Sequence, residues 1–376
     1  MIIPFLTSLY ESRVHKEDWQ DRWDELLHEI QLYSLSSQVF HLIRQSGLSD
    51  RFPLSFMEAL KFKAEKVMFH NMLVKRETVN VLKALEQEGI PVIPLKGVIF
   101  SERYFGGWAV RGTSDVDLLI RREDLERAVR CVRGLGFQKE DRYHSLHYHT
   151  EYFKDLPAVG ESISVELHWN LLRKHTSEIR MERLWSSARP LVWADVSGAC
   201  CKELPLDHTF YAICLHSSKH HMLSLKHVLD VVHLIYRYGP SIDLERIMQM
   251  AREDGTCRQV RAALTVAYRM FPGLNRILPF TQPVRLPFFR CSLIREAEQR
   301  IKSYRYYAYL FCYPLITLDQ WKYRRLHLYY LLFPPKDRVA RMIGEKPDSR
   351  AIRLYWKLYK HRYRVYRSHQ HSAIKK

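Results

Sequence analysis

The chain has 376 residues, of which 47% are hydrophobic, and a formal net charge of +18. This length and hydrophobic content exclude a disordered protein and are sufficient for two or three folded domains. The chain contains no apolar run of membrane-spanning length, no signal-peptide pattern and no C-x-x-C pair among its seven cysteines, so we expect a cytoplasmic protein with reduced thiols.

Residues 1–89 are predicted to form a helical region. The segment "ETVNVLKALEQEG" places Val79, Leu82 and Leu85 at helical spacing, and Gly89 follows as a helix stop. The next region is therefore expected to begin at residue 90.

Residues 90–204 have the pattern of a small α/β unit. "IPVIPLKG" is a short apolar strand that ends at Lys96 and Gly97, just before an expected short helix, "VIFSERYF". In "RREDLERAVRCVRGLG" the apolar residues recur at helical spacing and a glycine pair ends the segment, which predicts an amphipathic helix. Alternating segments on either side of it predict further strands.

The segment "SDVDLLI" is predicted to be a strand with two unlike faces. Because side chains alternate across a strand, Val116, Leu118 and Ile120 fall on one face and Asp115 and Asp117 on the other. The apolar face can pack on helices while both carboxylates point into a common opening. An Asp-x-Asp pair also occurs by chance on exposed strands, so this motif alone does not establish a catalytic site.

A second segment, "SISVELHW", alternates in the same way. Glu166 and His168 share the open face with two serines, whereas Trp169 belongs to the apolar face. If the two strands are neighbours, Glu166 lies beside the Asp pair. Three clustered carboxylates repel one another unless a cation lies between them, and oxygen ligands suit Mg²⁺ or Mn²⁺. The sequence therefore predicts a metal site.

Lys96 and Gly97 form a candidate phosphate-binding turn. A glycine at the start of a helix lets backbone N–H groups approach a phosphate, and a lysine adds positive charge. A lysine at the end of a strand is also often only solvated, so this signal is short and weak by itself.

The segments "PLKG", "RGTSDVDLLI", "RGLGF" and "ELHW" follow one another in this order. The order resembles the little-characterised nucleotidyltransferase family of the DNA polymerase beta superfamily, with its Leu-Lys-Gly turn, its arginine before Asp-x-Asp-Leu-Leu and its helix ending in Leu-Gly-Phe/Tyr. The resemblance covers roughly residues 65–240. Four motifs in the same order are more specific than any one of them.

The resemblance assigns roles to particular residues. It implies that Asp115 and Asp117 bind metal, and that Glu166 is the third carboxylate, acting as a base or as a second-metal ligand. It also implies that Lys96 and Gly97 bind nucleotide phosphates.

The resemblance leaves the remaining phosphate contacts open. Arg111 matches the arginine before the Asp pair and can contact phosphate or pair with a carboxylate. The wider superfamily has a Gly-Ser turn whose serine contacts the triphosphate, whereas this chain has Leu-Lys-Gly. Ser101 or Ser114 can substitute for that serine, and the sequence selects neither.

Residues 208–236 are rich in histidine and resemble a second block of the same family. If they form one helix, a polar stripe runs along one face: His216, Lys219, His220, His227 and Asp230. The stripe can face the cleft, where Lys219 and His220 would bind nucleotide phosphate or the acceptor. It can also be a solvated face, and a metal site at the histidines lacks the glutamate of a zincin helix. A smaller cluster, "HSLHYH", is expected on a loop or strand edge.

Residues 205–340 are predicted to be helical, with breaks near 272–287 and 334–335, and residues 341–376 to be a basic helix or tail. The tail contains eleven Lys/Arg and two Asp/Glu, a net of +9, half of the total excess. It interleaves tyrosines with basic residues, so three uses are open: packing on the protein, contact with an anionic membrane surface, or contact with nucleic acid. Packing is preferred, with the membrane second. Nucleic acid is not favoured, because no recognised binding signature is present.

Taken together, the sequence predicts an α/β (α+β) fold in which a small mixed β-sheet nucleotidyltransferase core is flanked by N- and C-terminal helical regions. The expected reaction transfers a nucleoside monophosphate from an NTP to an unidentified small-molecule, peptide or sugar acceptor, with Mg²⁺ or Mn²⁺ as cofactor and pyrophosphate leaving. Two alternatives are a tRNA-binding or tRNA-modifying protein and an inactive scaffold of the same fold.

Overall fold

A computed structural model describes residues 1–14, 19, 22–139, 148–156, 160–196, 198–344 and 351–374, and for residues 337, 338, 341, 351 and 365–374 it describes the backbone alone. Of the "HSLHYH" cluster, His144 and His147 lie outside these residues, and His149 lies on a strand.

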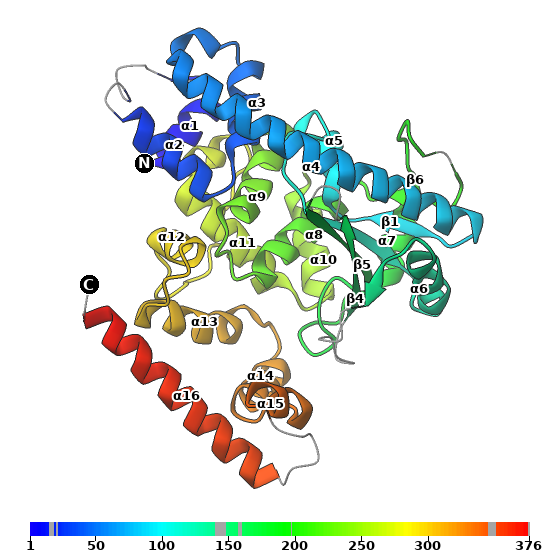
Figure 1. Ribbon diagram of the computed structural model, residues 1–376, viewed down its shortest axis with the longest axis vertical. Helices are drawn as coiled ribbons and strands as arrows, with labels where there is room; N and C mark the ends of the chain where they lie inside the picture. The colour runs from blue at the N-terminus through cyan, green and yellow to red at the C-terminus, as the bar shows by residue number, and fades with distance from the viewer. Residues whose placement is uncertain are drawn as a thin grey trace.

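The described part of residues 1–89 is mainly helical, as predicted. They form α1 (Ile2–Tyr10), α2 (Trp23–Leu32), α3 (Ser36–Gln45) and the long α4 (Leu54–Gln87). Phe56 and Leu60 in the first half of α4 pack in one hydrophobic core with α1 to α3, whereas its second half packs in the core of the sheet. Helix α4 therefore joins the two cores, and Figure 1 shows it running from the N-terminal helices across to the sheet.

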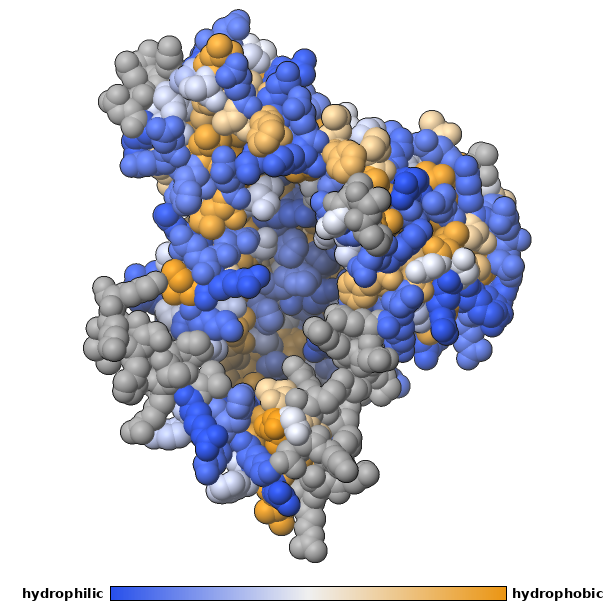
Figure 2. Space-filling view, in the orientation of Figure 1, coloured by the Kyte–Doolittle hydropathy of each residue, from blue (hydrophilic) through white to orange (hydrophobic). Residues whose placement is uncertain are grey.

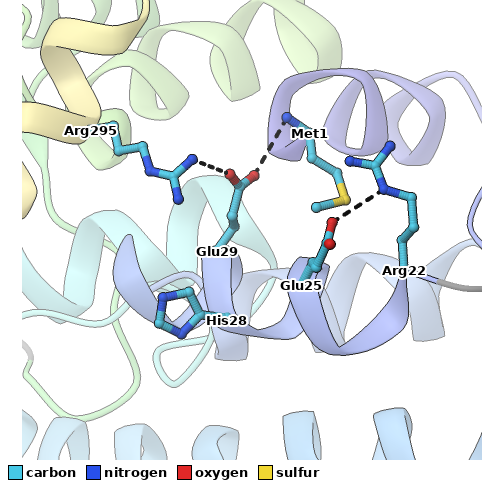
Figure 3. A pocket seen from close by; sticks show the side chains of 6 residues that line it. All are labelled: Met1, Arg22, Glu25, His28, Glu29 and Arg295. Atoms are coloured by element: carbon cyan, nitrogen blue, oxygen red, sulfur yellow. Dashed lines mark hydrogen bonds and ion pairs between the residues drawn. The ribbon is translucent and has the colours of Figure 1, made fainter.

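Glu29 of α2 ties the N-terminal helices to a helix far along the chain. Its carboxylate accepts from the backbone N–H of Ile2 at 2.8 Å and forms ion pairs with the Met1 amino group and with Arg295 of α12 (Ser292–Glu298). Figure 3 shows these groups around a surface pocket. Because the charges of Glu29 are already paired within the protein, this pocket is a structural junction.

The predicted α/β unit contains a five-stranded mixed sheet. Its strands are β1 (Val92–Pro94), β2 (Asp115–Ile120), β3 (Gln138–Lys139), β4 (His149–Leu156) and β5 (Glu161–His168), in the order β1-β2-β5-β4-β3. Strands β2 and β5 are parallel, and the other neighbours are antiparallel. The predicted helices are α5 (Gly97–Phe105) and α6 (Leu125–Gly134), and α7 (Met181–Ser187) precedes a small hairpin of β6 (Arg189–Pro190) and β7 (Lys202–Glu203). This mixed sheet flanked by helices confirms the predicted fold class.

The two faces of the sheet pack against different parts of the chain. Val116, Leu118 and Ile120 lie in one core with Ala128 and Val132 of α6 and the second half of α4, as the alternation predicts. Leu119, on the aspartate face, packs instead in the larger helical core. Trp169 was expected on the buried face, but β5 ends at His168 and the partly buried Trp169 ring lies 4.3 Å from the Arg122 guanidinium.

The rest of the chain is helical with breaks at the predicted prolines. Its helices are α8 (Leu206–Lys219), α9 (Leu225–Tyr238), α10 (Leu244–Glu253), α11 (Cys257–Met270), α12, α13 (Tyr304–Thr317), α14 (Trp321–Leu332), α15 (Lys336–Met342) and α16 (Ala351–Ile374). Short 3₁₀ turns cover Ser49–Arg51, Arg122–Asp124, Gly239–Ser241 and Pro272–Arg276. Within the described part of the chain, no helix combines the length and apolar character that crossing a membrane requires.

The prediction of one helix over residues 208–236 is wrong. Helix α8 ends at Lys219 and α9 begins at Leu225. Between them His221 and Met222 adopt the left-handed backbone conformation, with φ of 58° and 57°, which does not continue a right-handed helix. The sequence pattern does not reveal this turn, because both helices bury apolar residues and the helical spacing of these residues continues from one helix to the next.

His233 of α9 joins three parts of the fold. Its Nε2 donates to the backbone oxygen of Tyr104 at 2.9 Å, and its Nδ1 accepts from the Tyr10 hydroxyl at 3.1 Å. The ring also stacks on Phe105 at a centroid distance of 3.9 Å. The side chain is buried, and burial lowers the pKa of His233 to about 4. It is therefore neutral in the folded protein.

We predict that His233 makes the fold sensitive to acid. The unfolded chain protonates this histidine near pH 6.5 and the folded chain only near pH 4, so stability present above pH 6.5 is lost as the pH falls between these values. The loss is on the order of 3 kcal/mol. His233→Gln should lower the free energy of unfolding at pH 7 and flatten its dependence on pH in this window, as measured by urea titration at several pH values. His28→Gln, at an exposed histidine of α2, is the control and should change neither; an unchanged pH dependence in His233→Gln would contradict the assignment.

Candidate active site

The register of β2 and β5 brings the three predicted carboxylates together. Asp117 is directly opposite Glu166 in the parallel pair, and Asp115 is opposite Ser164. One carboxylate oxygen from each of Asp115, Asp117 and Glu166 lies within 4.8 Å of the others. The conditional prediction that Glu166 lies beside the Asp pair is therefore confirmed.

Two basic side chains neutralise these acids. Lys96 Nζ lies 2.9 Å from Asp117 Oδ2, and His168 Nε2 lies 3.0 Å from both Asp117 Oδ1 and Glu166 Oε2. Asp117, Lys96 and His168 are almost completely buried, whereas Glu166 keeps 18% of its side-chain surface exposed. The buried acids are thus held by one ammonium group and one imidazole.

The protonation of the site follows from these contacts. Burial alone would raise the pKa of Asp117, but Lys96 and His168 together hold it well below its usual range. Burial likewise opposes the charge of Glu166, and the hydrogen bond from His168 lowers its pKa. For His168, burial is outweighed by the two carboxylates, which raise its pKa. In this arrangement, the acids are ionised and the basic groups carry the balancing charge.

The turn before α5 approaches the Asp pair closely. Gly97 has a φ of +76°, and a Cβ placed there would lie 3.2 Å from the backbone oxygen of Asp115. Lys96 precedes the helix as its N-cap, and its side chain makes no capping hydrogen bond. The first turn of α5 therefore offers free backbone N–H groups beside the carboxylates. Thr113 also orients Asp115, by donating from Oγ1 to Oδ1 at 3.1 Å.

Helix α8 lies over the carboxylate face of the sheet. Lys96 Nζ donates to His216 Nε2 at 3.2 Å, and Lys219 Nζ donates to the Tyr148 hydroxyl at 2.6 Å. His220 lies at the exposed edge, in ring contact with His216 and with His227 of α9. Although residues 208–236 form two helices, the turn between them still gathers the predicted lysine and histidines at one place.

Positive charge dominates this side of the site. Burial and the neighbouring Lys96 lower the pKa of Lys219 to about 8, and burial with Arg111 lowers that of Lys226 to about 8. For the same reasons, burial first and Lys96 second, the pKa of His216 and of His227 lies well below the usual range. Burial and mutual repulsion therefore disfavour the charged forms of these four groups.

A small cavity lies between the sheet and α8. It has a volume of about 20 Å³. Five polar or charged residues and four apolar residues, one of them Leu171, line it; the polar and charged ones are Lys96, Asp117, His168, His216 and Lys219. This volume holds about one water molecule. Figure 2 shows a hollow of hydrophilic surface at the centre of the viewed face, between the sheet and the helices.

Arg111 is paired with a carboxylate. Its Nε and Nη2 donate to the two carboxylate oxygens of Asp230 in α9, at 2.6 and 2.7 Å, and both side chains are buried. Of the two roles that the sequence left open, the structure shows the ion pair, and a phosphate contact stays a prediction. This pair links the segment before β2 to the C-terminal helices.

The two candidate serines differ in their surroundings. Ser101 is fully buried, where its Oγ donates to the Gly107 backbone oxygen and accepts from the Arg111 N–H. It holds the loop before β2, and its phosphate contact stays a prediction. Ser114 is exposed immediately before β2, so its phosphate contact stays a prediction.

Sequence reasoning did not assign His168, Tyr148 or Lys226 to the site. Alternation along "SISVELHW" places His168 on the carboxylate face, so the signal was present without a role attached. Tyr148 reaches the site because β4 pairs with β5, which sequence alone does not indicate. Lys226 follows a turn that the single-helix prediction missed.

A comparison with protein families shows which family the chain matches. The sequence model of a family described as an uncharacterised nucleotidyltransferase matches residues 20–272, more than half of the chain. No curated protein and no solved structure matches the chain.

We predict that Arg111 is required for the stability of the domain arrangement. Arg111→Met leaves the buried Asp230 carboxylate without its partner, at a cost of about 3–5 kcal/mol. The double variant Arg111→Met/Asp230→Leu should recover much of this loss, because both charges are then removed. The free energy of unfolding is the measurement. Arg103→Met, which breaks the exposed pair with Glu203, is the control with an expected loss below about 1 kcal/mol. Equal losses of unfolding free energy in Arg111→Met and Arg103→Met would show that the buried pair stabilises the fold no more than an exposed pair does.

Proposed function

Since the chain belongs to an uncharacterised nucleotidyltransferase family, we propose that it is a metal-dependent enzyme that transfers a nucleoside monophosphate from an NTP to an acceptor, with pyrophosphate leaving. The observation that carries this proposal is the cluster of Asp115, Asp117 and Glu166, whose carboxylate oxygens lie within 4.8 Å of one another. The basic groups opposite this cluster support it, because an NTP brings negative charge to the same place.

The three carboxylates fit a divalent cation. Their oxygens are the ligands that Mg²⁺ and Mn²⁺ prefer. The negative charge of the cluster is balanced by Lys96 and His168, in contacts of 2.9–3.0 Å. Asp115, Asp117 and Glu166 would hold the ion. When bound, Mg²⁺ or Mn²⁺ supplies charge stabilisation to the phosphates of the substrate.

The groups beside the carboxylates are suited to bind the triphosphate. Lys96 and Lys219 of α8 both line the cavity, and α5 begins directly after Lys96 with its N-terminal N–H groups. Because the cavity itself holds only about one water molecule, the nucleoside has to bind outside it. The hydrophilic hollow in Figure 2 offers this space.

Nucleotidyl transfer requires positioning more than covalent participation of the protein. An acceptor oxygen forms a bond to the α-phosphorus as the bond to the bridging oxygen of pyrophosphate breaks. Lys96 and Lys219 would neutralise the charge on the phosphates. Glu166, the more exposed of the two acids that His168 contacts, would either complete the metal site or take the acceptor proton. We propose a small molecule, a peptide or a sugar as the acceptor.

We predict that Asp117→Asn abolishes turnover, and the free energy of unfolding is measured beside it because Lys96 and His168 lose a charged partner. The amide keeps the shape of the side chain but removes the charge that holds both Lys96 and the metal, so the rate should fall by about 100-fold or more. The assay mixes the full chain with Mg²⁺ or Mn²⁺, each labelled NTP in turn, and candidate acceptors that include tRNA, and follows pyrophosphate release.

Glu123→Gln, at an exposed carboxylate just beyond β2, is the matched control and should be fully active. If no NTP is bound or turned over by the unaltered protein with any acceptor, the enzyme proposal fails and an inactive scaffold remains. Turnover with tRNA alone would show that the acceptor is a nucleic acid.

A further inference from the structure

Imidazole groups lie beside the carboxylates on the same face of the sheet. In the register of β2, β5 and β4, Asp117, Glu166 and Glu151 form one row across the strands. The adjacent row contains His168 opposite His149. The oxygen-rich end of this face at Asp115 and Asp117 is therefore continued by a mixed nitrogen and oxygen set.

The spacing of this mixed set suits a single ion. His168 Nε2 lies 3.0 Å and His149 Nε2 lies 3.8 Å from Glu166 Oε2, and the nearest ligand atoms of all three residues lie within 4.8 Å of one another. Two ligand atoms that are each about 2.1 Å from one ion lie about 3–4 Å apart. Small side-chain movements are therefore sufficient to bring the three residues onto one cation.

We propose that His149, Glu166 and His168 bind a divalent transition-metal ion, next to the oxygen-only position of Asp115 and Asp117. Imidazole nitrogen favours ions such as Co²⁺ and Zn²⁺, whereas Mg²⁺ prefers oxygen alone. When it binds, the ion replaces the proton on His168 Nε2, which otherwise lies between His168 and the carboxylates of Asp117 and Glu166. This inference rests on the proposed function only for the metal position at Asp115 and Asp117. The binding of an ion by His149, Glu166 and His168 does not depend on nucleotide turnover.

Co²⁺ binding tests this site, because the visible absorption of Co²⁺ reports its ligands and geometry. The full chain should bind Co²⁺ with an absorption spectrum of nitrogen and oxygen ligation, and a 100-fold excess of Mg²⁺ should not displace the ion. His149→Ala should weaken Co²⁺ binding by about 10-fold or more. His70→Ala is the matched control: its ring lies 3.1 Å from Glu161 of the same strand, but that pair is outside the three-residue set.

The outcomes separate this inference from the proposed function. Equal Co²⁺ affinity in His149→Ala and the unaltered chain, or ready displacement by Mg²⁺, overturns the mixed-ligand site even if NTP turnover with Mg²⁺ is found. Tight Co²⁺ binding that His149→Ala weakens supports the site even if no NTP is turned over.

A second inference comes from the surface of α16. Leu354 and Leu358 pack on Val339 and Ala340 of α15 in a small core separate from the two large ones. A different face of α16 is exposed, and on it four large side chains recur every three or four residues: Ile352, Trp356, Tyr359 and Tyr363, with 87%, 61%, 40% and 58% of their surface exposed. Figure 1 shows α16 at the opposite end of the molecule from α4.

This exposed stripe continues onto α14 and lies beside a row of cations. The Tyr359 hydroxyl donates to the backbone oxygen of Leu332, and Leu332 and Phe333 are themselves about half exposed. At helical spacing, Arg353, Lys357 and Lys360 fall along one side of the stripe. Residues 351–364 contain five Lys/Arg and no Asp/Glu. We name this surface, Ile352, Trp356, Tyr359, Tyr363, Leu332 and Phe333, the α14–α16 face.

We infer that the α14–α16 face binds the surface of an anionic lipid membrane. Tryptophan and tyrosine rings flanked by lysine and arginine are suited to the lipid interface, where the rings enter the headgroup region and the cations contact the headgroups. The aliphatic side chains of Ile352 and Leu332 favour lipid over nucleic acid, because a phosphate backbone and stacked bases offer them little to bury against. The charge of this helix is complementary to an anionic surface.

Vesicle sedimentation tests this inference. The full chain should sediment with phosphatidylcholine vesicles that contain 30% phosphatidylglycerol and remain soluble with pure phosphatidylcholine, and 0.5 M NaCl should weaken the binding. Trp356→Ser/Tyr363→Ser and Lys357→Glu/Lys360→Glu should each weaken binding by about 10-fold or more. Phe62→Ser, at an exposed aromatic residue of α4, is the control and should bind normally.

Two results would overturn the membrane surface. One is that the unaltered chain and all of its variants sediment equally with the anionic vesicles. The other is binding of tRNA, without vesicle binding, that the same substitutions in α16 abolish; this result would assign the α14–α16 face to nucleic acid.

Discussion

The structure depends on how two neighbouring negative charges are neutralised on the carboxylate face of the sheet. Asp117 and Glu166 lie opposite each other in parallel strands, and Asp117 is almost inaccessible to water. Such a pair is costly unless positive charge is supplied at hydrogen-bond distance. Lys96 comes from the turn before α5 and His168 from the strand of Glu166 itself. The Lys96 contact requires the close approach of that turn to β2, which Gly97 permits, whereas the His168 contact follows from the pairing of β5 with β2.

The helices that cover this face are fixed by a second set of buried polar contacts. The Arg111–Asp230 pair joins the segment before β2 to α9, and His233, one turn further along α9, bonds to the end of α5 and to α1. These contacts connect segments more than a hundred residues apart in sequence. Polar pairs of this kind have directional geometry, so they specify the position of α9 relative to the segment before β2, to α5 and to α1 in a way that apolar packing alone does not.

Alternation and local motifs predicted which residues share a face, and pairing between distant strands determined the rest. The aspartate and glutamate faces follow from the period of two, and the family resemblance supplied the roles that we propose for them. The neighbours of Glu166 across β4 could not be predicted, because strand register depends on contacts that a single sequence does not display. The turn at His221 and Met222 was missed for a different reason: both flanking helices bury apolar residues, so periodicity continues through a left-handed turn with no glycine.

The basic groups around the site lack enough negative charge from the protein to keep all of them in their charged forms. Even with ionised acids nearby, Lys219 and Lys226 have pKa values lowered to about 8, and His216 resists protonation. A folded protein gains nothing from gathering basic groups whose charge is disfavoured by burial and by one another. An NTP with its cation would add net negative charge at this position and restore the charged forms of these groups. The energetic cost of assembling them supports the proposal that this site binds a polyanion.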